Sequence, residues 1–431
     1  MEIKGKGKLA VLTGKKAGFE VPGNYIVIIL LISFSILLFL FYLDFITYKG
    51  NLEGEHILYV KMDGNTGSVL KVNNRYLKNP ASIKNSRNFS YGFYTIRYDI
   101  KKVKEKNGFL SIEGKIRGYE ESRLNWMRRY VLNIFDEIFI TEENLYAFSR
   151  ATILGEKAEV SKDMNDKFKY TGMAHLVVIS GSHISLVIVG MVKILDVINV
   201  KYRLKYIIAL AALSLYCTLI GMSPGILRAY IMGAMMILAR LLFEKEDSKK
   251  SLFISLIIIL VLNPYAAFDI SMQLSYMAVA AIIFFHPPVE KMCEKKFLYK
   301  LKEGIIKESI KLLILSLVIQ ITSIPLFLYY FDKLPLFSFL LNIVGVPVGT
   351  VLVEALFVVT LLNILQIKVF NFIILPIVKI IYDAFEGFIY FGGKIPLLQV
   401  SIEGRTDIWT VLLYYVVLVT VKRYMDLNCS K

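Results

Sequence analysis

Long apolar runs recur along this chain and limit what it can fold into. The hydrocarbon core of a bilayer is about 30 Å thick, and a helix needs about 20 mostly apolar residues to cross it. The first such run covers residues 25–43, and later runs cover residues 172–196, 206–221, 225–243, 250–262, 266–286, 309–331, 335–362, 366–391 and 408–421. The pattern therefore predicts a polytopic α-helical membrane protein with about ten transmembrane helices.

The composition argues against a water-soluble fold. Hydrophobic residues make up 56% of the 431 residues and charged residues only 20%, which is more apolar and less charged than soluble domains are. The formal net charge is +16. Cytoplasmic loops rich in Lys and Arg account for part of such an excess, and attraction to a polyanion such as nucleic acid accounts for the rest.

The two ends of the chain are expected on the cytoplasmic side. Residues 1–24 carry several Lys residues, so this tail should stay inside, and residues 25–47 form a transmembrane helix that anchors the chain and exports the segment after it. Residues 422–431 form the second tail, which begins with two basic residues. The run at 250–262 is short, and a re-entrant segment there would reverse the predicted sidedness of every later segment.

Residues 48–124 have a different pattern, with apolar and polar residues alternating from Tyr94 to Lys101. This alternation is typical of half-buried strands, and the sequence Asp63-Gly64-Asn65 supplies a turn. We therefore expect a small exported β-rich domain. In residues 125–148 apolar and charged positions follow helical spacing instead, which predicts an interfacial amphipathic helix.

Polar residues inside apolar runs are costly in lipid, so they point to function. His175 and His183 bracket residues 179–182, whose small side chains favour a helix break or a close helix contact. Two histidines without a third ligand nearby are a poor metal site. Hydrogen bonding across packed helices, or a pore-lining role without metal, is therefore favoured.

Arg228 lies one turn inside an apolar run and needs a partner. Asp269, Gln273 and Tyr276 follow helical spacing and form one stripe on a later helix. Arg228 therefore either pairs with Asp269 or faces a path for phosphate groups.

Two further segments place polar residues in apolar surroundings. Asn342 lies in residues 320–354, where three prolines are expected to interrupt the helix, and broken helices at membrane depth need protein or a cavity beside them. Lys379, Asp383 and Glu386 share a helix face, which an internal salt bridge explains.

Four blocks of this sequence resemble the membrane domain of the ComEC competence family. The blocks are residues 150–156 with 172–183, residues 223–232, residues 263–276 and, more loosely, Asn342 with Pro347. They occur in the family's order. The resemblance assigns residues 149–421 to a competence-type channel domain, and residues 48–124 are similar in place and size to the family's OB-like domain.

The resemblance implies a multi-pass protein of the bacterial plasma (inner) membrane that passes single-stranded DNA into the cytoplasm during natural transformation. No catalytic residue, cofactor or metal is expected in such a channel. The residues expected along the pore or DNA path are His175, Ser180, His183, Arg228, Asp269, Gln273 and Asn342.

The exported domain suits a role in binding that DNA. Residues 49–123 hold 15 Lys or Arg residues against 8 Asp or Glu residues, and basic grooves with aromatic rings bind single strands through phosphates and stacked bases. The expected DNA-binding residues are Tyr91, Tyr94, Arg97, Tyr98 and Lys101. The alternative is that the aromatic rings form the core of the domain and the lysines only solvate its surface.

Many family members also carry a carboxy-terminal metallo-β-lactamase-like nuclease domain. We expect that domain to be missing here, because only residues 422–431 come after the last run. The expected partners are then a separate nuclease, a DNA-receptor protein, a cytoplasmic helicase and membrane lipid, and a homo-oligomer stays open. Two other readings remain: a transporter or membrane enzyme acting on small molecules or lipids, and a non-conducting paralogue of the channel.

Overall fold

The structure is a computed structural model. It describes residue 42 and residues 46–106, 109–139, 141–157, 159–296, 298–300, 304–331, 333–334, 336–395, 399–401 and 407–429. The expected cytoplasmic tail and nearly all of the expected first transmembrane helix lie outside the described residues.

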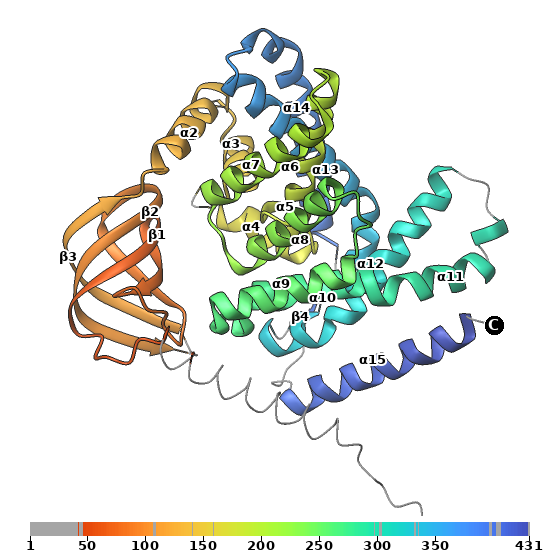
Figure 1. Ribbon diagram of the computed structural model, residues 1–431, viewed down its shortest axis with the longest axis horizontal. Coiled ribbons are helices and arrows are strands. Elements are labelled where there is room, and N and C mark those ends of the chain that lie inside the picture. Colours follow the sequence, from red (N-terminus) through yellow and green to blue (C-terminus); the bar gives the residue numbers. More distant parts are fainter. Residues whose placement is uncertain are drawn as a thin grey trace, which may run out of the picture. The chain divides into compact units, whose positions relative to one another are not determined.

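A small β domain precedes the helices, as the alternating pattern predicts (Figure 1). Its strands are β1 (Gly54–Val72), β2 (Ala81–Lys106) and β3 (Phe109–Glu121). Leu110 of β3 pairs with Ala81 at one end of β2 and with Glu105 at the other. Both ends of β1 also pair with β2. Each half of the two long strands therefore acts as a separate segment, and the sheet curls into a small barrel.

Four short helices come after the barrel: α2 (Asn125–Phe139), α3 (Glu143–Leu154), α4 (Lys162–Tyr170) and α5 (Ala174–Val177). The prediction of one interfacial helix over residues 125–148 is wrong, because the helix ends at Phe139. Phe135 and Phe139 are buried in a core shared with α3, α5, α13 and α14. The apolar face of α2 therefore packs against protein.

Long apolar helices dominate the rest of the described chain, and they identify a polytopic membrane protein. The helices and short elements are α6 (Gly181–Val197), α7 (Tyr202–Ile220), α8 (Pro224–Leu241), α9 (Ser248–Leu262), η1 (Pro264–Phe268), α10 (Ile270–Ala280), η2 (Ala281–Phe285), α11 (His286–Lys296), η3 (Leu298–Lys300), α12 (Ile305–Phe331), β4 (Lys333–Leu334), α13 (Ser338–Ile364), η4 (Lys368–Phe370), α14 (Asn371–Gly392), β5 (Val400–Ser401) and α15 (Ile408–Cys429). The pair β4 and β5 forms a second, two-stranded sheet.

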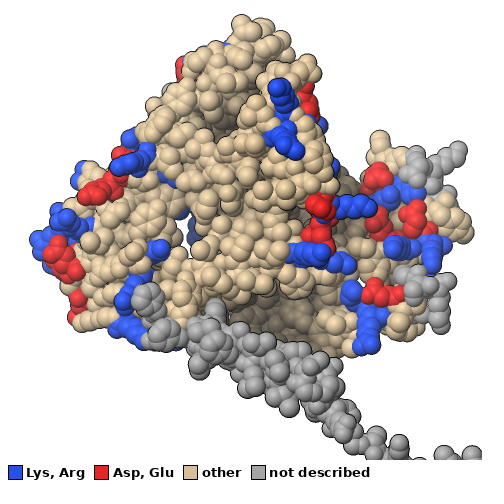
Figure 2. All heavy atoms as spheres, in the orientation of Figure 1, with Lys and Arg blue, Asp and Glu red and all other residues tan. Residues whose placement is uncertain are grey.

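Among the described residues, 6 helices are long and apolar enough to cross a membrane: Tyr202–Ile220, Pro224–Leu241, Ile270–Lys296, Ile305–Phe331, Ser338–Ile364 and Ile408–Leu427. Helices α6 and α9 are shorter, and α14 carries three ionisable side chains. The total of about ten spans therefore stays a prediction. In Figure 2, charged side chains gather over the β strands and around α11, and much of the surface between them is uncharged.

Two of the three prolines of residues 320–354 do not break helices as expected, and the third, Pro335, lies outside the described residues. Helix α12 continues through Pro325 and α13 through Pro347. Neighbouring helices can stabilise a proline within a transmembrane helix. Helix α13 then packs closely along α5, because Gly345 faces Met173 and Gly349 faces Leu176 with no room for a Cβ atom.

Candidate functional site

The helix break predicted between the two histidines occurs at the start of α6. Val178 and Ser180 have extended backbones, and α6 begins at Gly181. The ring of His183 closes this break, because its Nδ1 accepts a hydrogen bond from the backbone N–H of Ser180 at 3.1 Å. The Ser180 hydroxyl lies 3.0 Å from the same nitrogen. His183 thus acts as part of the cap of its own helix.

This hydrogen bond assigns the tautomer of His183. A backbone N–H can only donate, so Nδ1 is the acceptor and Nε2 carries the proton of the neutral ring. The side chain is buried, and Nε2 has no partner among the described residues. Neither nitrogen then offers a free lone pair while the cap is intact, so the ring can donate to a ligand but is unsuited to bind a metal or accept a proton.

Arg228 of α8 lies beside this break, and three helices meet at its guanidinium. Its Nε donates to the Ser275 hydroxyl of α10 at 2.9 Å, and its Nη1 lies 3.5 Å from the Met232 sulfur. Its Nη2 lies 3.3 Å from the position that a Cβ atom of Gly181 would occupy. Tyr276 offers its ring at 5.9 Å. The side chain is only 6% exposed, and no described carboxylate pairs with it.

The pairing of Arg228 with Asp269 does not form, which corrects one of the two predicted alternatives. Asp269 caps α10 by accepting a hydrogen bond from the backbone N–H of Met272 at 2.8 Å. Gln273 donates to the Ala267 carbonyl at 2.8 Å. Successive residues of a helix are rotated by about 100°, so Ser275 lies on a different face of α10 from Asp269 and Gln273. The face with Ser275 is the one that points to α8. Gly225 of α8 lies opposite Ser271 and lets α8 and α10 approach closely. This small residue is the sequence feature that indicates the contact between the two helices.

The remaining two path residues lie along α5 and α13. His175 is exposed, and its Nδ1 lies 3.1 Å from the Gly172 carbonyl. Asn342 is half-buried on α13, and its side-chain oxygen has no hydrogen-bond partner among the described residues. The structure thus brings Ser180, His183 and Arg228 together at one break, with no described contact from His175 or Asn342 to Arg228.

The tyrosines expected to stack on DNA bases are buried in the barrel, which corrects that expectation. Tyr91 is 2% exposed, Tyr94 3% and Tyr98 0%. Tyr91 donates from its hydroxyl to the Leu154 carbonyl at 3.0 Å, and so joins the barrel to α3. These three rings therefore belong to the core of the barrel, which was the alternative interpretation of the aromatic residues. Arg97 and Lys101 are exposed.

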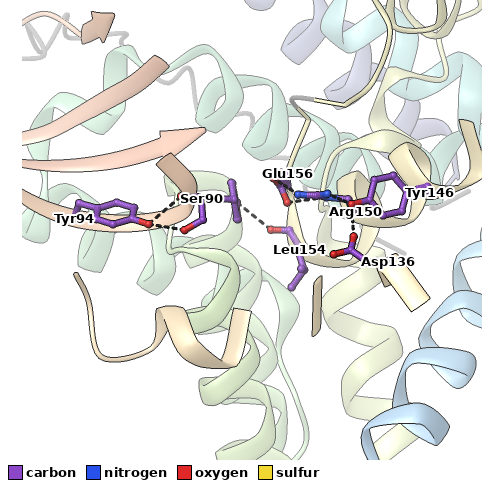
Figure 3. A network of polar contacts seen from close by, with 8 residues as sticks. Ser90, Tyr94, Asp136, Tyr146, Arg150, Leu154 and Glu156 are labelled. Atoms are coloured by element: carbon purple, nitrogen blue, oxygen red, sulfur yellow. Dashed lines mark hydrogen bonds and ion pairs between the residues drawn. The ribbon is translucent and has the colours of Figure 1, made fainter. Parts of the chain in front are cut away.

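Residues 150–156, part of the first resembling block, brace the junction between α3 and the barrel (Figure 3). Arg150 binds both carboxylate oxygens of Glu156, at 3.0 and 2.6 Å. Gly155 between them has φ 72°, a left-handed conformation that glycine adopts without strain. Burial raises the pKa of the Glu156 carboxyl, although Arg150 opposes the effect. The block therefore has a structural role at the end of α3.

A second brace, which the sequence did not reveal, joins the barrel to α7. Arg128 of α2 is 1% exposed. It donates to the carbonyl groups of Leu219 and Thr218 at the end of α7 and stacks 4.5 Å from the Phe93 ring centroid. Asn125 binds the backbone N–H and carbonyl of Phe93. The barrel therefore contacts the turn between α7 and α8.

Lys61 of the barrel completes this junction. Its Nζ donates to the Ile220 carbonyl at 3.4 Å and lies 5.0 Å from the Tyr91 ring centroid. Burial, together with the charge of Arg128, lowers the pKa of Lys61 to about 8. Burial also raises the pKa of Asp63.

The comparisons with known proteins settle the family. A sequence profile described as "Competence protein" matches residues 152–426. The chain belongs to the competence protein family. This competence-family chain is 25% identical over 225 residues to ComE operon protein 3 of Bacillus subtilis (strain 168), covering 52% of the chain and 27% of that protein. It is 26% identical over 204 residues to the uncharacterized protein YcaI of Escherichia coli (strain K12), covering 46% of the chain and 26% of that protein.

An uncharacterized protein of Aquifex aeolicus (strain VF5) is 26% identical over 158 residues, covering 36% of this competence-family chain and 37% of that protein. The match thus covers only 26% to 37% of the length of these relatives. No solved structure matches it.

Proposed function

We propose that this chain passes single-stranded DNA across the bacterial inner membrane into the cytoplasm during natural transformation. The observation that carries the proposal is Arg228, a buried cation without a described carboxylate partner, beside the break at Ser180 in a competence-family membrane protein. Buried charges need a partner, and an arginine without one in a membrane domain marks a path for anions.

The position of Arg228 fits the order of events in uptake. The barrel contacts the turn between α7 and α8 through Lys61 and Phe93. Arg228 lies one helical turn beyond that turn, on α8. A strand that leaves the barrel at this end therefore meets Arg228 early in the membrane. One cation neutralises phosphate weakly, and weak sites release what enters them.

The other path residues keep their assignments as proposals. Ser180, His183, His175, Asp269, Gln273 and Asn342 are proposed to supply polar groups along the route. On the barrel, Arg97 and Lys101 are proposed to bind phosphates. A separate nuclease, a DNA-receptor protein and a cytoplasmic helicase are proposed partners, as is a second copy of the chain. The rival function is a transporter or membrane enzyme that acts on small molecules or lipids by proton or metal chemistry. It fits less well, because His183 has no free lone pair.

A transformation assay tests the proposal. Arg228→Gln should abolish entry of labelled DNA into the cytosol and leave the amount of membrane-inserted protein unchanged. Arg240→Gln is the matched control, because Arg240 lies in the last turn of the same helix with an exposed side chain. Normal transformation by well-expressed Arg228→Gln would overturn the proposal. Loss of folded protein in that variant would instead assign Arg228 to helix packing.

A further inference from the structure

We propose that the N-terminus of α6 and the guanidinium of Arg228 together form a binding subsite for one phosphate group. The inference rests on the proposed function for its ligand, a phosphodiester of single-stranded DNA. It goes beyond that function by naming the atoms that hold the phosphate. These atoms are the first backbone N–H groups of α6 and the Nη2 of Arg228.

The first observation is the state of the arginine. Arg228 is more than nine-tenths buried, with 6% of its surface exposed. Its Nε is engaged by Ser275 and its Nη1 is near Met232, but Nη2 donates to no described group. Nη2 is also the atom that lies against Gly181, at 3.3 Å from the missing Cβ position. The free donor therefore points to the first residue of α6.

The second observation is the helix that it faces. Helix α6 is 17 residues long, and the first N–H groups of a helix have no acceptor within it. Ser180 and His183 form a capping box that serves the backbone N–H groups of Ser180 and His183, so the N–H groups of Gly181 and Ser182 have no described acceptor. The helix dipole places partial positive charge at this end. The guanidinium and the helix N-terminus therefore bring two positive charges together. They repel each other unless an anion lies between them.

The chemistry of the surroundings favours an anion from outside the chain. The nearest acidic residue in sequence on the facing helix, Asp269, is used to cap α10. A phosphodiester has two oxygens that share one negative charge. One oxygen can accept from Nη2 of Arg228 and the other from the N–H groups of Gly181 and Ser182. Helix N-termini bind phosphates in this way, and broken membrane helices present them to anionic substrates.

Two glycines of α6 give a sharp test. Gly181→Ala places a methyl group where the guanidinium approaches the helix and keeps every charge. Gly190→Ala is the matched control, because nothing lies within 4 Å of its Cβ position. The full chain in a maltoside detergent is titrated with a fluorescent oligothymidylate, and inorganic phosphate is the competitor. We expect Gly181→Ala to weaken oligonucleotide binding about tenfold, the effect of losing one charge-assisted hydrogen bond, and Gly190→Ala to bind as the wild type does.

Further binding experiments distinguish a phosphate of DNA from a phosphate of a lipid headgroup. An uncharged peptide nucleic acid of the same sequence should not compete, whereas inorganic phosphate should. If the oligonucleotide does not bind and a fluorescent phosphatidylglycerol binds the wild type more tightly than Gly181→Ala, the subsite belongs to lipid headgroups and the DNA assignment is overturned. Equal binding by the two folded glycine variants would overturn the subsite itself.

The subsite and the proposed function can fail separately. If Gly181→Ala binds oligonucleotide tenfold more weakly and Arg228→Gln still transforms normally, the subsite stands and the proposed function fails. If Arg228→Gln stops uptake and the two glycine variants bind alike, the function stands and the subsite is overturned.

Discussion

Glycines in the barrel show how much one Cβ atom matters in this chain. A Cβ at Gly114 would lie 2.1 Å from the backbone carbonyl oxygen of Asp99 on the paired strand, whereas Gly118 of the same strand has nothing within 4 Å. We predict that Gly114→Ala lowers the free energy of unfolding of the barrel by about 2–3 kcal/mol, because backbone must move. Gly118→Ala should change it by less than about 0.5 kcal/mol. Thermal unfolding of the two purified variants checks this, and equal midpoints would contradict it.

Lys61 predicts a pH dependence of stability. Its pKa of about 8 in the folded protein is below the value of an unfolded lysine, about 10.4. Between these pH values the unfolded chain binds more protons, so the free energy of unfolding rises with pH there. Below pH 8 the folded protein carries the full cost of a buried charge. Lys61→Met removes that cost, on the order of 1–3 kcal/mol.

The variant should therefore unfold at a higher temperature than wild type at pH 7, and the difference should shrink as the pH approaches 10. Unfolding midpoints of both proteins at the two pH values give the measurement. A difference that does not change with pH would show that Lys61 keeps an ordinary pKa.

At single residues, the sequence predicted which polar groups matter better than it predicted their partners. The small residues around Ser180 indicated the break, and the break is there. The partner of Arg228 was not predictable, because Asp269 and Ser275 are both within reach along the sequence and only the rotation of α10 decides between them. Tyr91, Tyr94 and Tyr98 were open to two interpretations, since strand alternation does not tell which face is covered.

Among the elements, α2 connects the barrel to the membrane helices through one buried arginine. Arg128→Met should release the α7 carbonyls and increase hydrogen exchange at the end of α7 and in β2, at a cost of about 2–4 kcal/mol. Its neighbour Arg129 is the control, because its one ion pair among the described residues is an exposed pair with Glu121, and Arg129→Met should cost less than about 1 kcal/mol. Equal exchange in the two variants would show that Arg128 does not brace the junction.

The element boundaries show where periodicity stops being informative. The helical pattern of residues 125–148 continues across the end of α2, because both α2 and α3 bury one face in the same core. The three ionisable residues of α14 predicted a salt bridge within the helix, yet Lys379 pairs with Glu142 on the connection between α2 and α3. Only the folded chain brings these segments together, so spacing along one helix could not reveal the pair.

For the whole molecule, the contacts of the barrel predict which loops lie on which side of the membrane, and this topology can be measured. The barrel and the turn between α7 and α8 are in contact, so both should be outside, whereas the turn between α8 and α9 lies at the other end of α8 and should be inside. Ser82→Cys and Met222→Cys should react with an impermeant thiol reagent on intact cells that lack the native cysteines. Ser248→Cys should react only after permeabilisation. All three positions are exposed. Reaction of Ser248→Cys in intact cells would overturn the topology.

The closure of the barrel by β3 sets an order on how the chain can be made. Because β3 pairs with both ends of β2, the sheet keeps two open edges until residues 109–121 have been synthesised. Contacts that join distant parts of a chain form slowly, and unpaired strand edges invite association with other chains. A ribosome that stalls before Phe109 would therefore leave a nascent chain with an incomplete sheet, whose two unpaired edges can associate with other chains. Chaperone capture during synthesis should accordingly peak while β2 has emerged and β3 has not.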